Sequence, residues 1–142
     1  MVEKPELFNL LPGRTEGDRK LCLVWDRSAK GTYSWSFFKS KECYVLRRLH
    51  STQERGVLAK NLTVYGMERP VSRAFYDSVR SSLQEIGCLQ NETAWIDSQS
   101  FRVTIDGICT IDYTYSEESP EIVLLMAMAA RMNGAGLGGG QA

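Results

Sequence analysis

Hydrophobic positions in the first half of the chain follow the period of β-strands. Tyr33, Trp35 and Phe37 alternate with serines, which predicts a strand with one aromatic and one polar face. Residues 21–25 are apolar on both faces, which indicates a strand in the middle of a sheet. We expect two further strands at 43–49 and 58–65.

From Val71 onward the apolar positions recur at helical spacing. They are Val71, Phe75, Val79, Leu83 and Ile86. Gly87 follows them, where a helix commonly ends on a residue with positive φ. The pattern predicts a helix over 71–86.

Two β-rich runs flank Asp106-Gly107 and predict a hairpin over 101–115. A two-residue turn would mix polar and apolar side chains on each face, whereas a three-residue loop separates them. The second register pairs Phe101, Val103 and Ile105 with Tyr113, Ile111 and Cys109, and Arg102 and Thr104 with Asp112 and Thr110. Because a slip of one residue moves every side chain to the other face, we expect the second register. Gly107 or Ile108 would then carry the irregular backbone, and the polar face would be exposed to water.

Ser119, Pro120 and Glu121 suit an N-cap, a first helical position and a positively polarised helix end. They predict a helix from Pro120 to about Met132, ended by Asn133-Gly134. This helix has no polar face before Arg131, so it must be buried on most sides, in its own core or against another chain.

These elements predict an α+β fold, with an antiparallel sheet of about five or six strands and two packed helices. The order is strands, helix, hairpin, helix. A chain of 142 residues fits one domain, and no repeat or linker divides it. We expect a flexible leader over 1–18, a single domain over 19–133 and a Gly-rich flexible tail over 134–142.

The composition, 43% hydrophobic and 24% charged, is that of an ordinary globular protein. The apolar run at 122–130 is much shorter than the roughly 20 residues of a membrane-spanning helix. The N-terminus lacks a secretory signal, so we expect a cytoplasmic protein. The four cysteines form no C-x-x-C pair and are expected to be reduced and buried in the core.

The sequence contains no phosphate-binding loop, nucleophile elbow or metal-ligand spacing, so we expect no cofactor, metal or catalytic centre. Its single histidine, His50, is expected on the surface. An enzyme of unrecognised type would have to combine His50 with scattered carboxylates such as Asp26 and Asp97.

Charge divides the chain into two halves. Residues 1–71 hold 13 basic and 8 acidic residues, net +5, and residues 72–142 hold 4 and 9, net −5. The acidic positions Asp106, Asp112, Glu117, Glu118 and Glu121 are either a solvated loop and helix start or a site for a basic protein partner. In the basic half, Arg47, Arg48 and His50 near aromatic strands could bind nucleic acid, but the aromatic alternation favours a core face.

The order of elements, with Trp95 and Ile105-Asp106-Gly107 after the first helix, resembles the immunity proteins of bacterial toxin–immunity systems, including contact-dependent inhibition. The resemblance implies a protein that inhibits a cognate toxin by covering its active site. The order also resembles the class I chaperones of type III secretion, which bind an effector and dimerise, although this chain lacks their long N-terminal helix. That second resemblance implies a homodimer through the Pro120–Met132 helix. Neither resemblance assigns a functional residue.

Overall fold

The computed structural model describes residues 18–27, 30–40, 43–53, 62–91 and 98–137. They form β1 (Asp18–Asp26), β2 (Thr32–Ser40), β3 (Cys43–Gln53), β4 (Leu62–Val71), α1 (Arg73–Ile86), β5 (Leu89–Gln90), β6 (Gln99–Ile105), β7 (Ile108–Tyr115) and α2 (Pro120–Leu137). The α+β class and the order of elements are confirmed. The sheet has seven strands, slightly more than the expected five or six.

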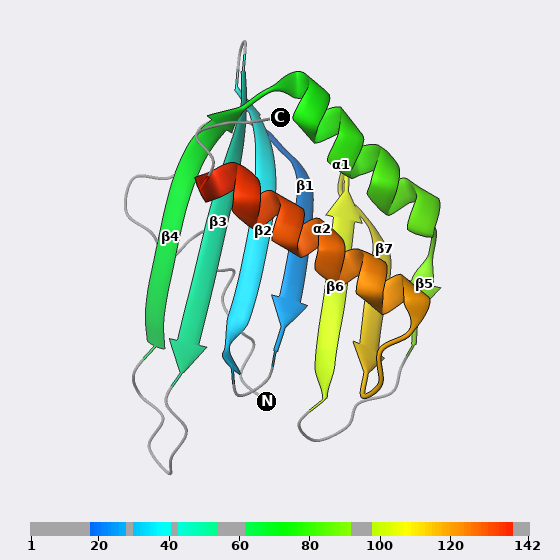
Figure 1. Ribbon diagram of the computed structural model, residues 1–142. Coiled ribbons are helices and arrows are strands. Elements are labelled where there is room, and N and C mark those ends of the chain that lie inside the picture. Colours follow the sequence, from blue (N-terminus) through cyan, green and yellow to red (C-terminus); the bar gives the residue numbers. More distant parts are fainter. Residues whose placement is uncertain (1–17, 28–29, 41–42, 54–61, 92–97, 138–142) are drawn as a thin grey trace.

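The strands lie in the order β4-β3-β2-β1-β6-β7-β5, antiparallel except for β5 beside β7. Both helices lie on one face of the sheet, and α2 crosses the strands (Figure 1). The central position of β1 confirms the interpretation of 21–25. Among the described residues, no helix combines the length and the apolar character needed to cross a membrane.

The main core lies between the sheet and the helices. Leu21, Leu23, Trp35, Phe37, Phe101, Val103 and Ile111 enter it from the sheet, and Phe75, Val79, Leu83, Ile122, Leu125 and Met132 from the helices. The aromatic face of β2 is therefore a core face, as predicted. Ser34 and Ser36 lie on its other, polar face, and they are buried as well. The Ser36 hydroxyl donates to Cys22 Sγ at 3.3 Å, which gives this buried group a partner.

The expected boundary between β4 and α1 lies too early in the sequence. Val71 is the last residue of β4, and Ser72 caps the helix by accepting a hydrogen bond from the Phe75 N–H at 3.0 Å. Val71 still faces the core, which explains its place in the helical pattern. Gly87 ends α1 with φ of 79°, as expected. Of the strand expected at 58–65, residues 58–61 lie outside the described residues.

The β6–β7 hairpin combines both registers. Phe101 pairs with Tyr113, Arg102 with Asp112 and Val103 with Ile111, as predicted. Nearer the turn the register shifts by one, so that Thr104 pairs with Cys109 and Ile105 with Ile108, and the two pairs expected there are wrong. The turn residues Asp106 and Gly107 have φ of 51° and 80°, as a two-residue type I′ turn requires, and a bulge restores the apolar face.

The two-residue strand β5 was not predicted, because it is too short to show a period. Asn91 extends it with its side chain: Nδ2 donates to the Thr114 carbonyl at 2.8 Å, and Oδ1 accepts from the Thr114 N–H at 3.0 Å. An amide side chain thus replaces backbone pairing at the edge of β7.

α2 continues through Asn133-Gly134 to Leu137, so the expected helix end and the start of the tail at 134 are wrong. Gly134 does not have a positive φ and lies within the helix. The expected leader and tail otherwise fall on residues 1–17 and 138–142, outside the described residues.

All four cysteines are free thiols, but only Cys22 is buried. Cys43, Cys88 and Cys109 are exposed because they lie at or near the ends of strands. The expectation of core cysteines is therefore wrong for these three.

Candidate functional site

α2 has a buried and an exposed side, although both are apolar. Ser119 starts the helix: its hydroxyl accepts from the Ile122 N–H at 3.3 Å, and its carbonyl accepts from the Val123 N–H at 3.0 Å. Ile122, Leu125, Met128, Ala129 and Met132 face the core. The opposite side, here called the outer α2 face, consists of Pro120, Val123, Leu124, Ala127, Ala130, Arg131 and Gly134, all exposed.

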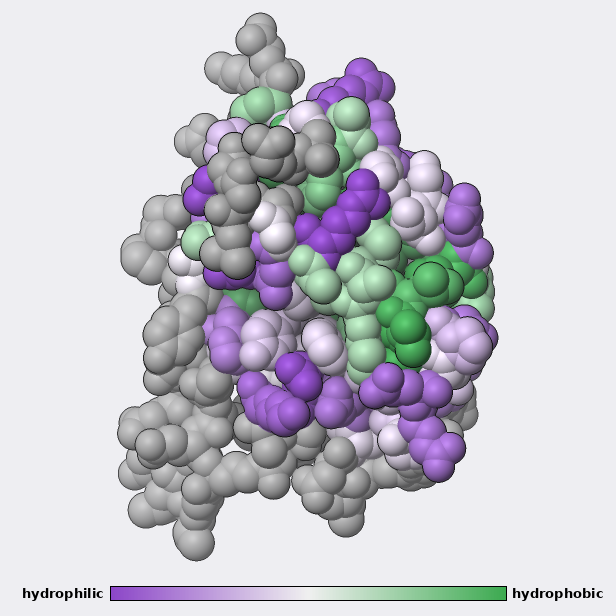
Figure 2. Space-filling view, viewed as in Figure 1, coloured by the Kyte–Doolittle hydropathy of each residue, from purple (hydrophilic) through white to green (hydrophobic). Residues whose placement is uncertain are grey.

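The outer α2 face includes large apolar side chains in contact with solvent. Val123 is 51% and Leu124 54% exposed. Apolar side chains gather over the first half of α2, with hydrophilic ones at their margin (Figure 2). A contiguous apolar patch rimmed by polar residues is typical of a protein interaction site.

Polar contacts hold the second half of α2 in place. Asn133 Oδ1 accepts from Trp35 Nε1 and from Arg48 Nη1, both at 3.1 Å. Arg131 donates to Ser78 Oγ on α1 at 2.6 Å, and its guanidinium lies 5.3 Å from the centre of the Phe75 ring. α2 is thus tied to both the sheet and α1, which fixes the direction of its outer face.

We expect Asn133→Ala to lower the free energy of unfolding by about 2 kcal/mol. It removes the acceptor of two hydrogen bonds, one of them from a charged group, and leaves the buried Trp35 N–H without this partner. The better helix propensity of alanine offsets only about 0.5 kcal/mol of the loss. Asn133→Asp keeps an acceptor oxygen opposite Arg48 and should stay within about 1 kcal/mol of the wild type. Urea unfolding measures both, and an Asp variant less stable than the Ala variant would contradict this role.

The five predicted acidic residues do not form one surface. Glu117 and Glu118 are exposed just before α2, and Glu121 lies in its first turn. Asp106 lies at the other end of β7, about 23 Å away for a strand of this length, and pairs with Arg80 Nη2 at 2.7 Å.

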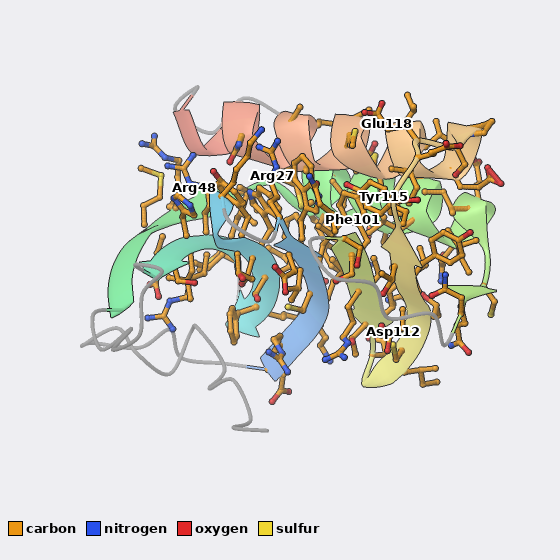
Figure 3. The ribbon with its side chains drawn as sticks, turned by 90° about the horizontal axis from the view of Figure 1, so that it is seen from below. Arg27, Arg48, Phe101, Asp112, Tyr115 and Glu118 are labelled. Carbon is orange, nitrogen blue, oxygen red and sulfur yellow. The ribbon has the colours of Figure 1, made fainter. Side chains whose placement is uncertain are left out.

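Asp112 lies on the other face of the sheet. It pairs with Arg102 at 3.5 Å, with both side chains exposed. Figure 3 shows Asp112 and Glu118 on opposite sides of the sheet. Only Glu117, Glu118 and Glu121 therefore adjoin the outer α2 face.

A hydrogen-bonded aromatic cluster supports the connection between β7 and α2. Trp25 Nε1 donates to the Tyr115 hydroxyl at 3.0 Å, and this hydroxyl donates to Gln99 Oε1 at 2.9 Å. The pKa of Tyr115 is raised, chiefly because the hydroxyl is buried, and the charge of Glu118 adds to this effect. The hydrogen bond from Trp25 and the charge of Arg27 act in the opposite direction, but they do not cancel it. Arg27, Tyr115 and Glu118 lie on the same side of the sheet as α2 (Figure 3). Tyr115 is the last residue of β7, so this cluster lies next in the chain to the acidic segment.

The residues considered for nucleic-acid binding do not form a stacking platform. Trp35 and Phe37 are core residues, and Arg47 is buried on the opposite face with Nε 2.8 Å from a Glu68 carboxylate oxygen. Tyr33 stacks on His50 with ring centres 4.0 Å apart and planes inclined by 4°. The ring faces on which a nucleic-acid base would stack are thus covered by neighbouring rings.

His50 is half-buried, and its Nε2 lies 3.3 Å from the Lys30 carbonyl oxygen. Within the described ranges, no group of three or more His, Cys, Asp or Glu side chains could hold a metal ion.

The outer α2 face was not identified from the sequence, because a helix that is apolar all round does not indicate which side faces the core. Comparison of the chain with protein-family models, curated proteins and solved structures finds no match.

Proposed function

We propose that this protein works by binding another protein, with the outer α2 face as the contact surface. The observation that carries the proposal is the exposure of Val123 and Leu124 on a helix otherwise fixed in the core. Exposed leucine and valine side chains give binding energy when a partner removes them from water, roughly 25 cal/mol for each Å² of apolar surface. The rigid attachment of α2 limits the entropy lost on binding.

The charges beside this surface indicate the kind of partner. Glu117, Glu118 and Glu121 form an acidic margin at the start of the outer α2 face. A partner with basic residues around an apolar centre would meet both features, and opposite charges speed association and set specificity. We propose a cytoplasmic immunity protein of this kind, a stoichiometric inhibitor that covers the active site of a cognate toxin and is not itself an enzyme.

The first experiment co-expresses the chain with the product of the adjacent reading frame. We expect the two proteins to co-purify and the chain to neutralise toxicity. A chain that neither binds nor neutralises that product would contradict the immunity proposal.

Variants then test the contact surface by calorimetric titration against the same toxin. Leu124→Asp should raise Kd at least about 100-fold, because it places a charge in the centre of the apolar contact. Glu118→Lys should raise Kd about tenfold at low salt and less at high salt, where charges are screened. Asp112→Lys, an exposed carboxylate on the other face, is the matched control and should change Kd less than twofold. Equal weakening by Leu124→Asp and Asp112→Lys would rule out the outer α2 face as the contact.

A further inference from the structure

The outer α2 face has the spacing of a helix-pairing seam. Its members Pro120, Val123, Leu124, Ala127, Ala130, Arg131 and Gly134 recur at intervals of three and four residues. Such a repeat keeps one stripe of a helix directed at a partner helix. Arg131 is the one charged member of the stripe, and its other six members are apolar.

The sizes of these side chains are complementary when the stripe meets a copy of itself in the opposite direction. Pro120, Val123 and Leu124 occupy the first half, and Ala127, Ala130 and Gly134 the second. With a twofold axis at Ala127, Leu124 lies against Ala130 of the second copy and Pro120 against its Gly134. A parallel pair would place large residues against large ones and leave a gap between the small ones, which close packing disfavours.

The charges agree with the same arrangement. Glu121 and Arg131 lie on the same side of the stripe, ten residues and thus about 15 Å apart along the helix. In the antiparallel pair, Arg131 of one copy comes within about 3 Å, measured along the axis, of Glu121 of the other. Arg131 uses one nitrogen on Ser78 but is exposed, and a guanidinium has five N–H donors.

We propose that the free protein forms an antiparallel homodimer in which the outer α2 faces of two copies pack together. The dimer uses the same surface as the proposed function but goes beyond it, because the partner is a second copy and not a toxin. The stripe from 120 to 134 is only about 21 Å long, so its contact is smaller than the roughly 800 Å² per partner of a standard interface. The dimer should therefore dissociate in the micromolar range, and a tighter partner would displace the second copy.

Sedimentation velocity and cysteine cross-linking test the dimer. We expect the full chain to sediment as a dimer at 100 µM and Leu124→Asp as a monomer. In a Cys43→Ser, Cys88→Ser, Cys109→Ser background, Ala127→Cys should form a disulfide-linked dimer on oxidation, because the twofold axis brings the two thiols together. Ala74→Cys, an exposed alanine on α1, is the matched control and should remain monomeric. Circular dichroism and thermal unfolding establish that each variant is folded.

The outcomes separate the dimer from the proposed function. A wild-type chain that sediments as a monomer, or an Ala127→Cys variant that links no faster than Ala74→Cys, would overturn the dimer. The binding of toxin by Leu124→Asp is measured separately. If Ala127→Cys links as expected but Leu124→Asp still neutralises the toxin fully, the dimer stands and the proposed toxin contact fails.

Discussion

Leu125→Ala is expected to lower the free energy of unfolding by about 2–5 kcal/mol, whereas Leu124→Ala should change it by less than about 0.5 kcal/mol. Leu125 is fully buried among core residues, and Leu124 is 54% exposed. Both substitutions remove the same atoms from adjacent positions of one helix, so the small difference in helix propensity is common to both. The difference between the two losses in free energy of unfolding therefore measures how much the burial of Leu125 contributes to stability.

Urea unfolding at neutral pH measures both free energies. The order should reverse for partner binding, where Leu124→Ala weakens affinity and a folded Leu125→Ala does not. Equal stability losses at the two positions would contradict the assignment of inner and outer sides to α2. A loss confined to Leu124 would mean that the helix is turned by about 100° from the position described.

The sequence predicts α2 and its start, but not its orientation. Ser119-Pro120-Glu121 carries local signals that act within one turn, and the N-cap bonds of Ser119 confirm them. The direction of the helix depends on contacts with distant parts of the chain, such as Asn133 with Trp35 and Arg48. Helical periodicity identifies a buried side only when the other side is polar, and here it is apolar.

In the β6–β7 hairpin, apolar alternation predicts most of the strand pairing but does not reveal the β-bulge near the turn. Alternation placed Phe101 and Val103 opposite Tyr113 and Ile111, which is confirmed. Neither uniform register contains the bulge that lies between Val103 and Thr104. A bulge allows the Asp106-Gly107 turn its favoured geometry while the rest of the hairpin keeps its apolar face.

The five acidic residues are close together in the sequence but not in space. Asp106 and Asp112 are near Glu117 in the chain, yet an eight-residue strand separates Asp106 from it, and alternation directs Asp112 to the other face. Once the strand β7 is accepted, this separation follows from its geometry. The pairing of Asp106 with Arg80 could not be predicted, because it depends on where α1 crosses the sheet.

Gly31→Ala is expected to lower the free energy of unfolding by about 2–5 kcal/mol. Gly31 joins β1 to β2 with φ of 96°, and its carbonyl accepts from the Arg27 N–H at 2.9 Å. A left-handed backbone costs an L-residue about 1–2 kcal/mol. The added Cβ would also lie 2.3 Å from the Ser51 carbonyl oxygen, which is backbone of β3 and cannot rotate away. Relief of that contact requires a shift of the paired strands, at a further cost of about 1–3 kcal/mol.

Gly107→Ala separates the two contributions, because Gly107 also lies between paired strands with φ of 80°, but a Cβ there meets no atom within 4 Å. It should cost only the backbone contribution, about 1–2 kcal/mol. Thermal and urea unfolding of the two variants measure the difference. If Gly31→Ala proves no more destabilising than Gly107→Ala, then the close approach of β3 to the β1–β2 turn does not constrain the sheet. A larger loss at Gly31 would show that the turn requires glycine for the space it leaves to Ser51 as well as for its backbone conformation.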